Sequence, residues 1–137
     1  GANDWVLVHD AARPCLRRTD LDLLLTQAGA HPVGGILAVP VRDTMKRAQQ
    51  SGDIAATVER RNLWHALTPQ MFRLGALERA ISRAVADGTV VTDEAQAMEL
   101  MGTSGMLVQG HAENIKVTVT DDLAIAELFL ARLEEKE

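Results

Sequence analysis

The chain has 137 residues, 47% of them hydrophobic and only 3% aromatic, and its formal net charge at pH 7 is −5. This length fits one domain, or the larger part of one, with a core of aliphatic side chains. The acidic balance argues against general binding to nucleic acid, and without a long apolar run we expect no membrane span.

The first predicted element is a short buried strand at Trp5–Val8, where four apolar residues stand in a row. Asp10 and Arg13 follow it directly, separated by two alanines. Ligand sites in open α/β sheets lie at the carboxyl ends of strands, so we expect a site here. Asp10 suits a metal ion or a hydroxyl and Arg13 a phosphate, although a turn cap and a surface cation would show the same pattern.

The next two elements indicate the fold class. Thr19, followed by acids in the first turn, predicts a helix start, and Gly29 ends the helix. Residues 33–41 form a second predicted buried strand. Strand, helix and strand in this order predict a right-handed parallel crossover, so the predicted fold class is α/β.

Residues 42–61 depart from this pattern. Two segments that alternate polar and apolar residues flank a turn at 51–53, which predicts a β-hairpin too polar to join a core. A charged hairpin that leaves a compact domain is expected to hold a partner, most simply a second copy of the chain. A solvated surface hairpin is the alternative.

The second half of the chain is predicted to alternate helices and short strands. Residues 63–72 are interpreted as an apolar segment that ends in a turn at Pro69. Hydrophobic spacing predicts two helices and two short strands, at 72–86, 92–101, 105–110 and 114–118. Thr92 is expected to cap the second of these helices. A final helix, capped by Thr120, is expected to pack its apolar face on the sheet.

Candidate chemistry comes from cations and hydroxyls near the predicted strand ends, because the sequence spells no nucleophile triad, zinc cluster or phosphate-binding glycine loop. The set is Asp10, Arg13, Thr44, Arg60, Thr68, Thr92 and Lys116. It suits an anionic ligand with several phosphates, handled by position and charge. Each member alone also fits a structural role. His9 and His65 are expected to be hydrogen-bonded core histidines, and Cys15 a buried residue of a protein in the reducing cytoplasm.

Five ordered blocks carry a resemblance to a known family. They are HDAARP at 9–14, PVRDTMK at 40–46, LWHALTPQ at 63–70, TDEA at 92–95 and NIKVT at 114–118. Together they resemble the 2-C-methyl-D-erythritol 4-phosphate cytidylyltransferases of the non-mevalonate isoprenoid pathway. The resemblance implies a three-layer, Rossmann-like nucleotidyltransferase sheet with a protruding hairpin arm at about 42–61 that interlocks two subunits as a homodimer. Residues 1–137 would be the carboxy-terminal part of this single domain.

The implied reaction joins the phosphate of 2-C-methyl-D-erythritol 4-phosphate to the α-phosphorus of CTP. It releases pyrophosphate and uses Mg²⁺ or another divalent cation. By resemblance, Lys116 and Arg60 are the catalytic pair that positions the polyol phosphate, with Arg60 acting from the arm in the neighbouring subunit's site. The implied substrate contacts are Asp10, Arg13, Thr44, Thr68 and Thr92, and Asp10 also lies near the metal.

One departure from the family pattern concerns the start of the chain. The family carries a loop rich in glycine and arginine after its first strand, and no such loop occurs in this sequence. The sequence also begins without an initiating methionine, and no earlier element is present to pair with the first strand. We therefore expect this chain to be the later part of a longer protein. Base recognition and leaving-group stabilisation would depend on that loop, which leaves the activity of this chain alone open.

Two other hypotheses stay open at this stage. The first is a non-catalytic module for sugar-phosphate binding or dimerisation that kept the arm. The second is a cytidylyltransferase for a related polyol phosphate, such as ribitol phosphate.

Overall fold

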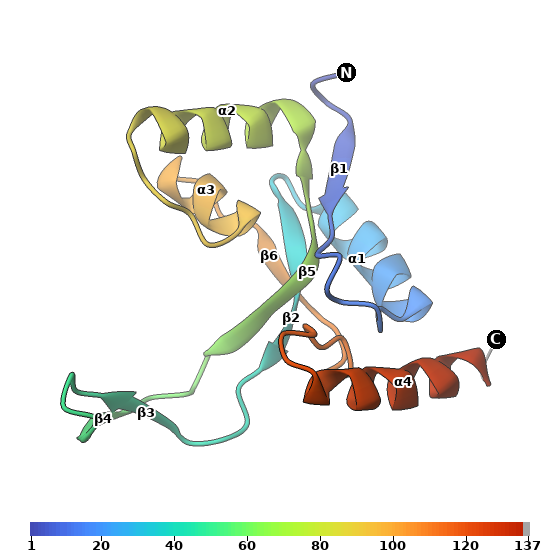
Figure 1. The fold of residues 1–137 in the computed structure, drawn as a ribbon. Helices are drawn as coiled ribbons and strands as arrows, with labels where there is room; N and C mark the ends of the chain where they lie inside the picture. Colours follow the sequence, from blue (N-terminus) through green and yellow to red (C-terminus); the bar gives the residue numbers. More distant parts are fainter. Residues whose placement is uncertain (136–137) are drawn as a thin grey trace.

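A computed structural model describes residues 1–135 and has a central four-stranded sheet with a separate hairpin (Figure 1). The strands are β1 Trp5–Val8, β2 Gly34–Pro40, β3 Met45–Ala48, β4 Ile54–Val58, β5 Trp64–Arg73 and β6 Met106–Gln109. The helices are α1 Arg18–Ala30, α2 Leu74–Ala86, α3 Glu94–Leu100 and α4 Asp121–Glu134. The predicted α/β class is confirmed. Of the helices in residues 1–135, none is both long and apolar enough to cross a membrane.

The sheet has the strand order β1-β5-β2-β6, with β5 antiparallel to both of its neighbours and β2 parallel to β6. β1 and β2 therefore run in the same direction, as the crossover prediction requires, but β5 lies between them. The predicted turn at Pro69 is wrong, because β5 continues through this residue. The pairing of β5 with β2 shifts register between Ile36 and Ala38, and Pro69 lies at this irregularity. A residue without an N–H is tolerated at such a place.

The core has two layers because successive strand residues point to opposite faces of the sheet. Leu37 and Met71 pack on α1, whereas Ile36 and Phe72 pack on α2 and α3. These four side chains are almost fully buried. α1 accordingly lies on one side of the sheet and α2 and α3 on the other (Figure 1), which gives the three layers that the family resemblance implies.

Two predicted helix caps are wrong and a third is right in position only. α1 begins one residue before Thr19, with Arg17 at the cap position and no side-chain cap. Asp93, not Thr92, caps α3, because its carboxylate accepts the N–H of Gln96 at 2.8 Å. Thr120 is at the cap position of α4 but makes no side-chain cap bond. In each case the spacing located the helix start to within two residues but did not decide which side chain meets the free N–H groups.

Two predictions for the last quarter of the chain are also wrong. Residues 114–118 form an irregular segment instead of a strand. α4 does not bury an apolar face on the sheet, because only Ala126 is buried in it and Leu123 and Leu128 are about half exposed. Its periodicity predicted an apolar face but could not predict what covers that face. Cys15 is buried as expected, and its thiol donates to the carbonyl of Ala126 at 3.5 Å.

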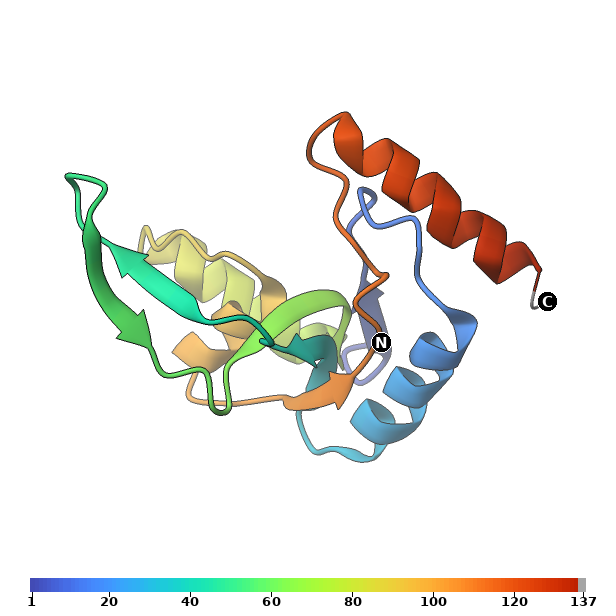
Figure 2. The same cartoon turned by 90° about the horizontal axis from the view of Figure 1, so that it is seen from below.

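The predicted hairpin is confirmed at β3 and β4. All side chains of β3 and all but the last of β4 are exposed. The hairpin extends away from the sheet and its helices (Figure 2), so its two strands pair mainly with each other. What it contacts stays a prediction.

Candidate functional site

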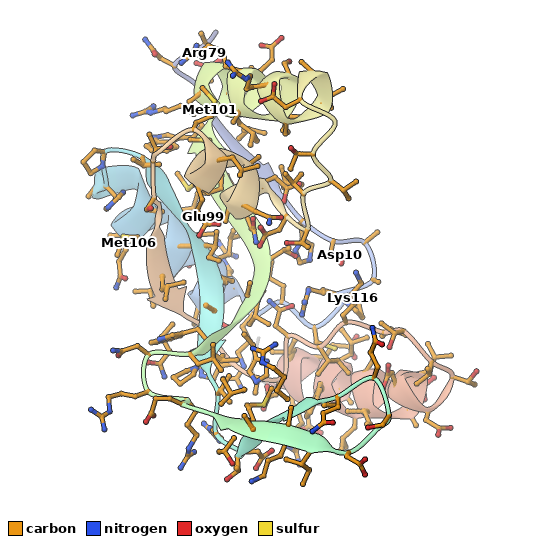
Figure 3. The ribbon with its side chains drawn as sticks, turned by 90° about the vertical axis from the view of Figure 1, so that its left-hand side faces the viewer. Asp10, Arg79, Glu99, Met101, Met106 and Lys116 are labelled. Atoms are coloured by element: carbon orange, nitrogen blue, oxygen red, sulfur yellow. The ribbon has the colours of Figure 1, made fainter. Side chains whose placement is uncertain are left out.

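The site forms where the loop after β1 meets the irregular segment 114–118. The ammonium of Lys116 lies 2.9 Å from Oδ2 of Asp10, and the two side chains point toward each other in Figure 3. Two further bonds hold the segments together. The guanidinium of Arg13 donates to the carbonyl of Asn114 at 2.7 Å, and the Val117 N–H donates to the carbonyl of Ala12 at 2.8 Å. Lys116 is thus fixed beside Asp10 and Arg13 by backbone geometry.

The loop itself is a tight turn with its own internal bonds. The Arg13 N–H donates to the carbonyl of Asp10 at 3.0 Å, which closes the turn. Oδ1 of Asp10 accepts the N–H of Ala12 at 3.1 Å, so the carboxylate also braces the backbone. The other oxygen stays directed at Lys116. The sequence pattern of an acid, two small residues and an arginine is therefore explained by one compact turn.

Thr68 of β5 ties this turn to the sheet. Its hydroxyl oxygen accepts the N–H of Asp10 at 3.0 Å, and its carbonyl accepts the side-chain N–H of Asn114 at 2.7 Å. The hydroxyl also lies 2.9 Å from Nδ1 of His9, whose Nε2 lies 2.9 Å from the carbonyl of Arg13. Four of the predicted site residues, Asp10, Arg13, Thr68 and Lys116, are therefore brought together.

Sequence reasoning missed two members of this network. Asn114 is 1% exposed and connects β5 with the segment that carries Lys116. His9 was expected in the core but is exposed, although both ring nitrogens have partners, and His65 is exposed as well. The closeness of His9 to Asp10 and of Asn114 to Lys116 in the sequence was the only available signal, because the bonds of His9 and Asn114 to Thr68 join segments that lie far apart in the chain.

The remaining three predicted residues lie elsewhere in this chain. Thr44 and Arg60 line a small pocket of about 180 Å³ at the base of the hairpin, and Arg60 donates to the carbonyl of Arg42. Thr92 precedes α3 and donates to the side chain of Gln96 at 3.1 Å. Within residues 1–135, no hydrogen bond or ion pair joins these three residues to Asp10 or Lys116.

Arg13 and Lys116 also line an open cleft of about 610 Å³. Apolar side chains form much of its wall, including those of Leu67 and Ile125. Nε of Arg13 and Oδ1 of Asn114 are buried and have no partner among the described residues. Two cations beside an apolar wall suit an anion that carries a carbon chain.

The charges of the site shift the pKa values of its groups. The hydrogen bond from Lys116 is the main cause that lowers the pKa of Asp10 below its ordinary value of 3.8, and the N–H of Ala12 adds to it. Burial lowers the pKa of Arg13, and the nearby Asp10 partly offsets this. An arginine stays charged at neutral pH after such a change. The site thus holds two cations and one anion.

Replacing Lys116 with alanine is expected to raise the pKa of Asp10, because the hydrogen bond and the positive charge that stabilise its carboxylate are both lost. A depressed pKa stabilises the folded protein above the unfolded-state value of 3.8. That stabilisation is lost as the pH falls through the folded-state pKa. The acid-side fall in stability should therefore be smaller in the variant. A ¹³C NMR titration of the Asp10 carboxyl checks the shift, and an unchanged pKa would contradict the ion pair.

Few side chains of this site could bind a metal ion. Among the described residues, no group of three or more His, Cys, Asp or Glu side chains could hold one. Asp10 offers one carboxylate near the cations, with one oxygen engaged by Lys116 and the other by the N–H of Ala12. It can serve as one ligand among several, with the others supplied from outside this part of the chain.

Comparisons with known proteins show which family the sequence resembles. A family model described as 2-C-methyl-D-erythritol 4-phosphate cytidylyltransferase matches residues 1–132. The chain is 57% identical over 129 residues to the protein of that name from Vibrio parahaemolyticus, covering 94% of this chain and 55% of that protein. For the Shewanella oneidensis protein the identity is 60% over 130 residues, covering 95% and 52%.

A solved structure of the Francisella tularensis protein of the same name has a similar fold. It matches with a TM-score of 0.88 at 39% identity, covering 94% of this chain and 60% of that chain. The chain spans about half the length of the curated relatives it matches.

Proposed function

The chain belongs to the 2-C-methyl-D-erythritol 4-phosphate cytidylyltransferase family, and on this basis we propose that the complete protein is a cytidylyltransferase of isoprenoid biosynthesis. It would transfer the cytidylyl group of CTP to 2-C-methyl-D-erythritol 4-phosphate and release pyrophosphate. In this transfer an oxygen of the polyol phosphate attacks the α-phosphorus of CTP. The bond from that phosphorus to the pyrophosphate oxygen breaks.

The observation that carries this proposal is the fixed placement of Lys116 and Arg13 at the end of β1. Both are held by bonds to the turn or its neighbouring segment, and neither depends on a ligand for its position. Phosphoryl-type transfer needs little covalent chemistry from the protein, because positioning and charge supply most of the catalysis. Lys116 would bind the polyol phosphate as a compact charge, and Arg13 would fix its orientation through its planar fork.

The remaining predicted site residues are proposed to contact the substrates in two ways, from this chain or from a second copy of it. Thr68 and Asp10 would contact the hydroxyls of the polyol, since Asp10 pairs with Lys116 and its N–H is bound by Thr68. Arg60 and Thr44 lie on the hairpin, so they would reach the same site only in a second copy of the chain. The protein would accordingly be a homodimer that exchanges arms. Thr92 would contribute from the loop before α3.

A divalent cation is proposed to join the reaction through Asp10. Mg²⁺ is commonly bound by one or two carboxylates together with substrate phosphates and water, and the single carboxylate of Asp10 fits this pattern. The ion would neutralise charge on the phosphates of CTP. We place the protein in the cytoplasm, where its free thiol at Cys15 would stay reduced.

Purified complete protein with CTP and Mg²⁺ is expected to release pyrophosphate when 2-C-methyl-D-erythritol 4-phosphate is added. A coupled assay for pyrophosphate measures the rate. Ribitol 5-phosphate under the same conditions is the matched control for acceptor specificity. No release with the methylerythritol phosphate would contradict the proposed function, and equal rates with both acceptors would contradict the proposed substrate.

A further inference from the structure

His9 lies outside the set of residues assigned above, yet its ring contacts both β5 and the last residue of the site's turn. Nδ1 is 2.9 Å from Oγ1 of Thr68, and Nε2 is 2.9 Å from the carbonyl oxygen of Arg13. The same Thr68 oxygen accepts the N–H of Asp10 at 3.0 Å. The imidazole therefore joins β5 to the end of the turn, and Thr68 joins β5 to its start.

The positions of the protons in this network follow from the partners. A carbonyl oxygen only accepts, so Nε2 of His9 must carry the hydrogen that reaches Arg13. A neutral imidazole has a single N–H, and Nδ1 is then an acceptor. With a neutral imidazole, the hydroxyl of Thr68 therefore donates to Nδ1. Because its oxygen also accepts from Asp10, the orientation of this hydroxyl is fixed.

This orientation limits what Thr68 can do for a ligand. Its hydrogen is committed to His9, and one lone pair is committed to the backbone of Asp10. One lone pair remains. Thr68 can accept a hydrogen bond from a ligand hydroxyl but has no hydrogen to donate to a phosphate oxygen.

We propose that His9, with its proton on Nε2, is a positioning residue for the transfer; this rests on the function proposed above. By accepting the hydroxyl hydrogen of Thr68 it holds the oxygen that anchors the N–H of Asp10. By donating to Arg13 it closes the other end of the turn. The Asp10 carboxylate is thereby kept against Lys116, and Thr68 is kept as an acceptor.

Two substitutions separate the two contacts of the ring. The amide of asparagine ends about as far from the backbone as Nδ1, and that of glutamine about as far as Nε2. H9N therefore keeps an acceptor for Thr68, whereas H9Q keeps a donor for the carbonyl of Arg13. Each substitution removes one hydrogen bond, so if His9 served stability alone, the two substitutions would change kcat/KM equally.

In the complete protein, H9A is expected to lower kcat/KM for the polyol phosphate by about tenfold, the factor expected when two hydrogen bonds of modest strength are lost. H9N should recover most of this loss and H9Q little, with equal melting temperatures for the two. Wild-type kcat/KM in H9A, or recovery by H9Q and not by H9N, would overturn the proposal. If H9A fails to fold, the comparison of H9N with H9Q still decides.

A second measurement does not depend on the enzyme assay. In protein labelled with ¹⁵N-histidine, at about pH 8 to keep imidazoles neutral, the His9 resonances should show the hydrogen on Nε2. T68V should shift the Nδ1 resonance, because the donor to it is lost. A hydrogen on Nδ1 would overturn the assignment. Failure of the pyrophosphate assay in the wild type, with these resonances as expected, would instead count against the proposed function.

Discussion

The K116A variant of the complete protein is expected to lose about 100- to 1,000-fold in kcat, the range that follows loss of one electrostatic group from a preorganised site. The attacking phosphate and the phosphates of CTP carry like charges. Two such charges 4 Å apart repel by about 1 kcal/mol in water and about 4 kcal/mol at the effective dielectric of a protein surface. Lys116 would offset this repulsion, and about 4 kcal/mol corresponds to roughly a thousandfold in rate.

Steady-state kinetics with both substrates measure this effect, and circular dichroism checks that the fold is intact. R79A is the matched control. It removes a cation from the exposed face of α2, well away from Lys116 (Figure 3), and should leave kcat within about twofold of the wild type. A K116A variant with kcat close to that of R79A would remove Lys116 from the proposed mechanism.

R60A is expected to cause a loss of similar size, because it removes the cation that the hairpin of a second copy is proposed to add beside Lys116 at the polyol phosphate. Its charge would act in the site of a second copy, because Arg60 is on the hairpin and, within residues 1–135, bonds to no residue of the site in its own chain. In this chain Arg60 lies at the base of the hairpin and contacts the carbonyl of Arg42. R47A is the matched control, since Arg47 is an exposed arginine on β3 of the same hairpin. Equal activity of R60A and R47A would contradict the proposed role.

Mixing the two inactive variants tests whether Arg60 acts across subunits. A mixed dimer of K116A and R60A has one site with both cations intact, if Arg60 reaches the neighbouring site. Random pairing makes half of the dimers mixed, so about a quarter of the wild-type activity should return after unfolding and refolding together. If Arg60 acts within its own subunit, every site keeps one defect and no activity returns.

Local patterns predicted most elements of this fold because each depends on neighbouring residues. The apolar run at Trp5–Val8 and the alternation around the turn at 51–53 both became strands at the expected places. The errors arose where a distant partner decides. The sequence around Pro69 predicts a turn, but Pro69 belongs to β5, which pairs with a strand on each side. α4 forms at the predicted place, but its spacing could not show that only Ala126 would be buried.

The site residues also fall into those that local patterns predicted and those whose roles depend on distant partners. Proximity to predicted strand ends identified Asp10, Thr68 and Lys116, which the structure brings together. His9 and Asn114 each bond to Thr68, which lies far away in the sequence, and no local pattern encodes that partner. A histidine beside apolar residues looks like a core residue until both of its ring contacts are known.

The ion pair between Lys116 and Asp10 has a thermodynamic consequence for ligand capture. In the empty protein the ammonium already has an anionic partner at 2.9 Å. An arriving phosphate would therefore replace one counter-charge with another, and part of the loss of side-chain freedom of Lys116 has occurred beforehand. This competition would make the cation selective, because a monoanion gains little over the resident carboxylate whereas a dianionic phosphate gains more.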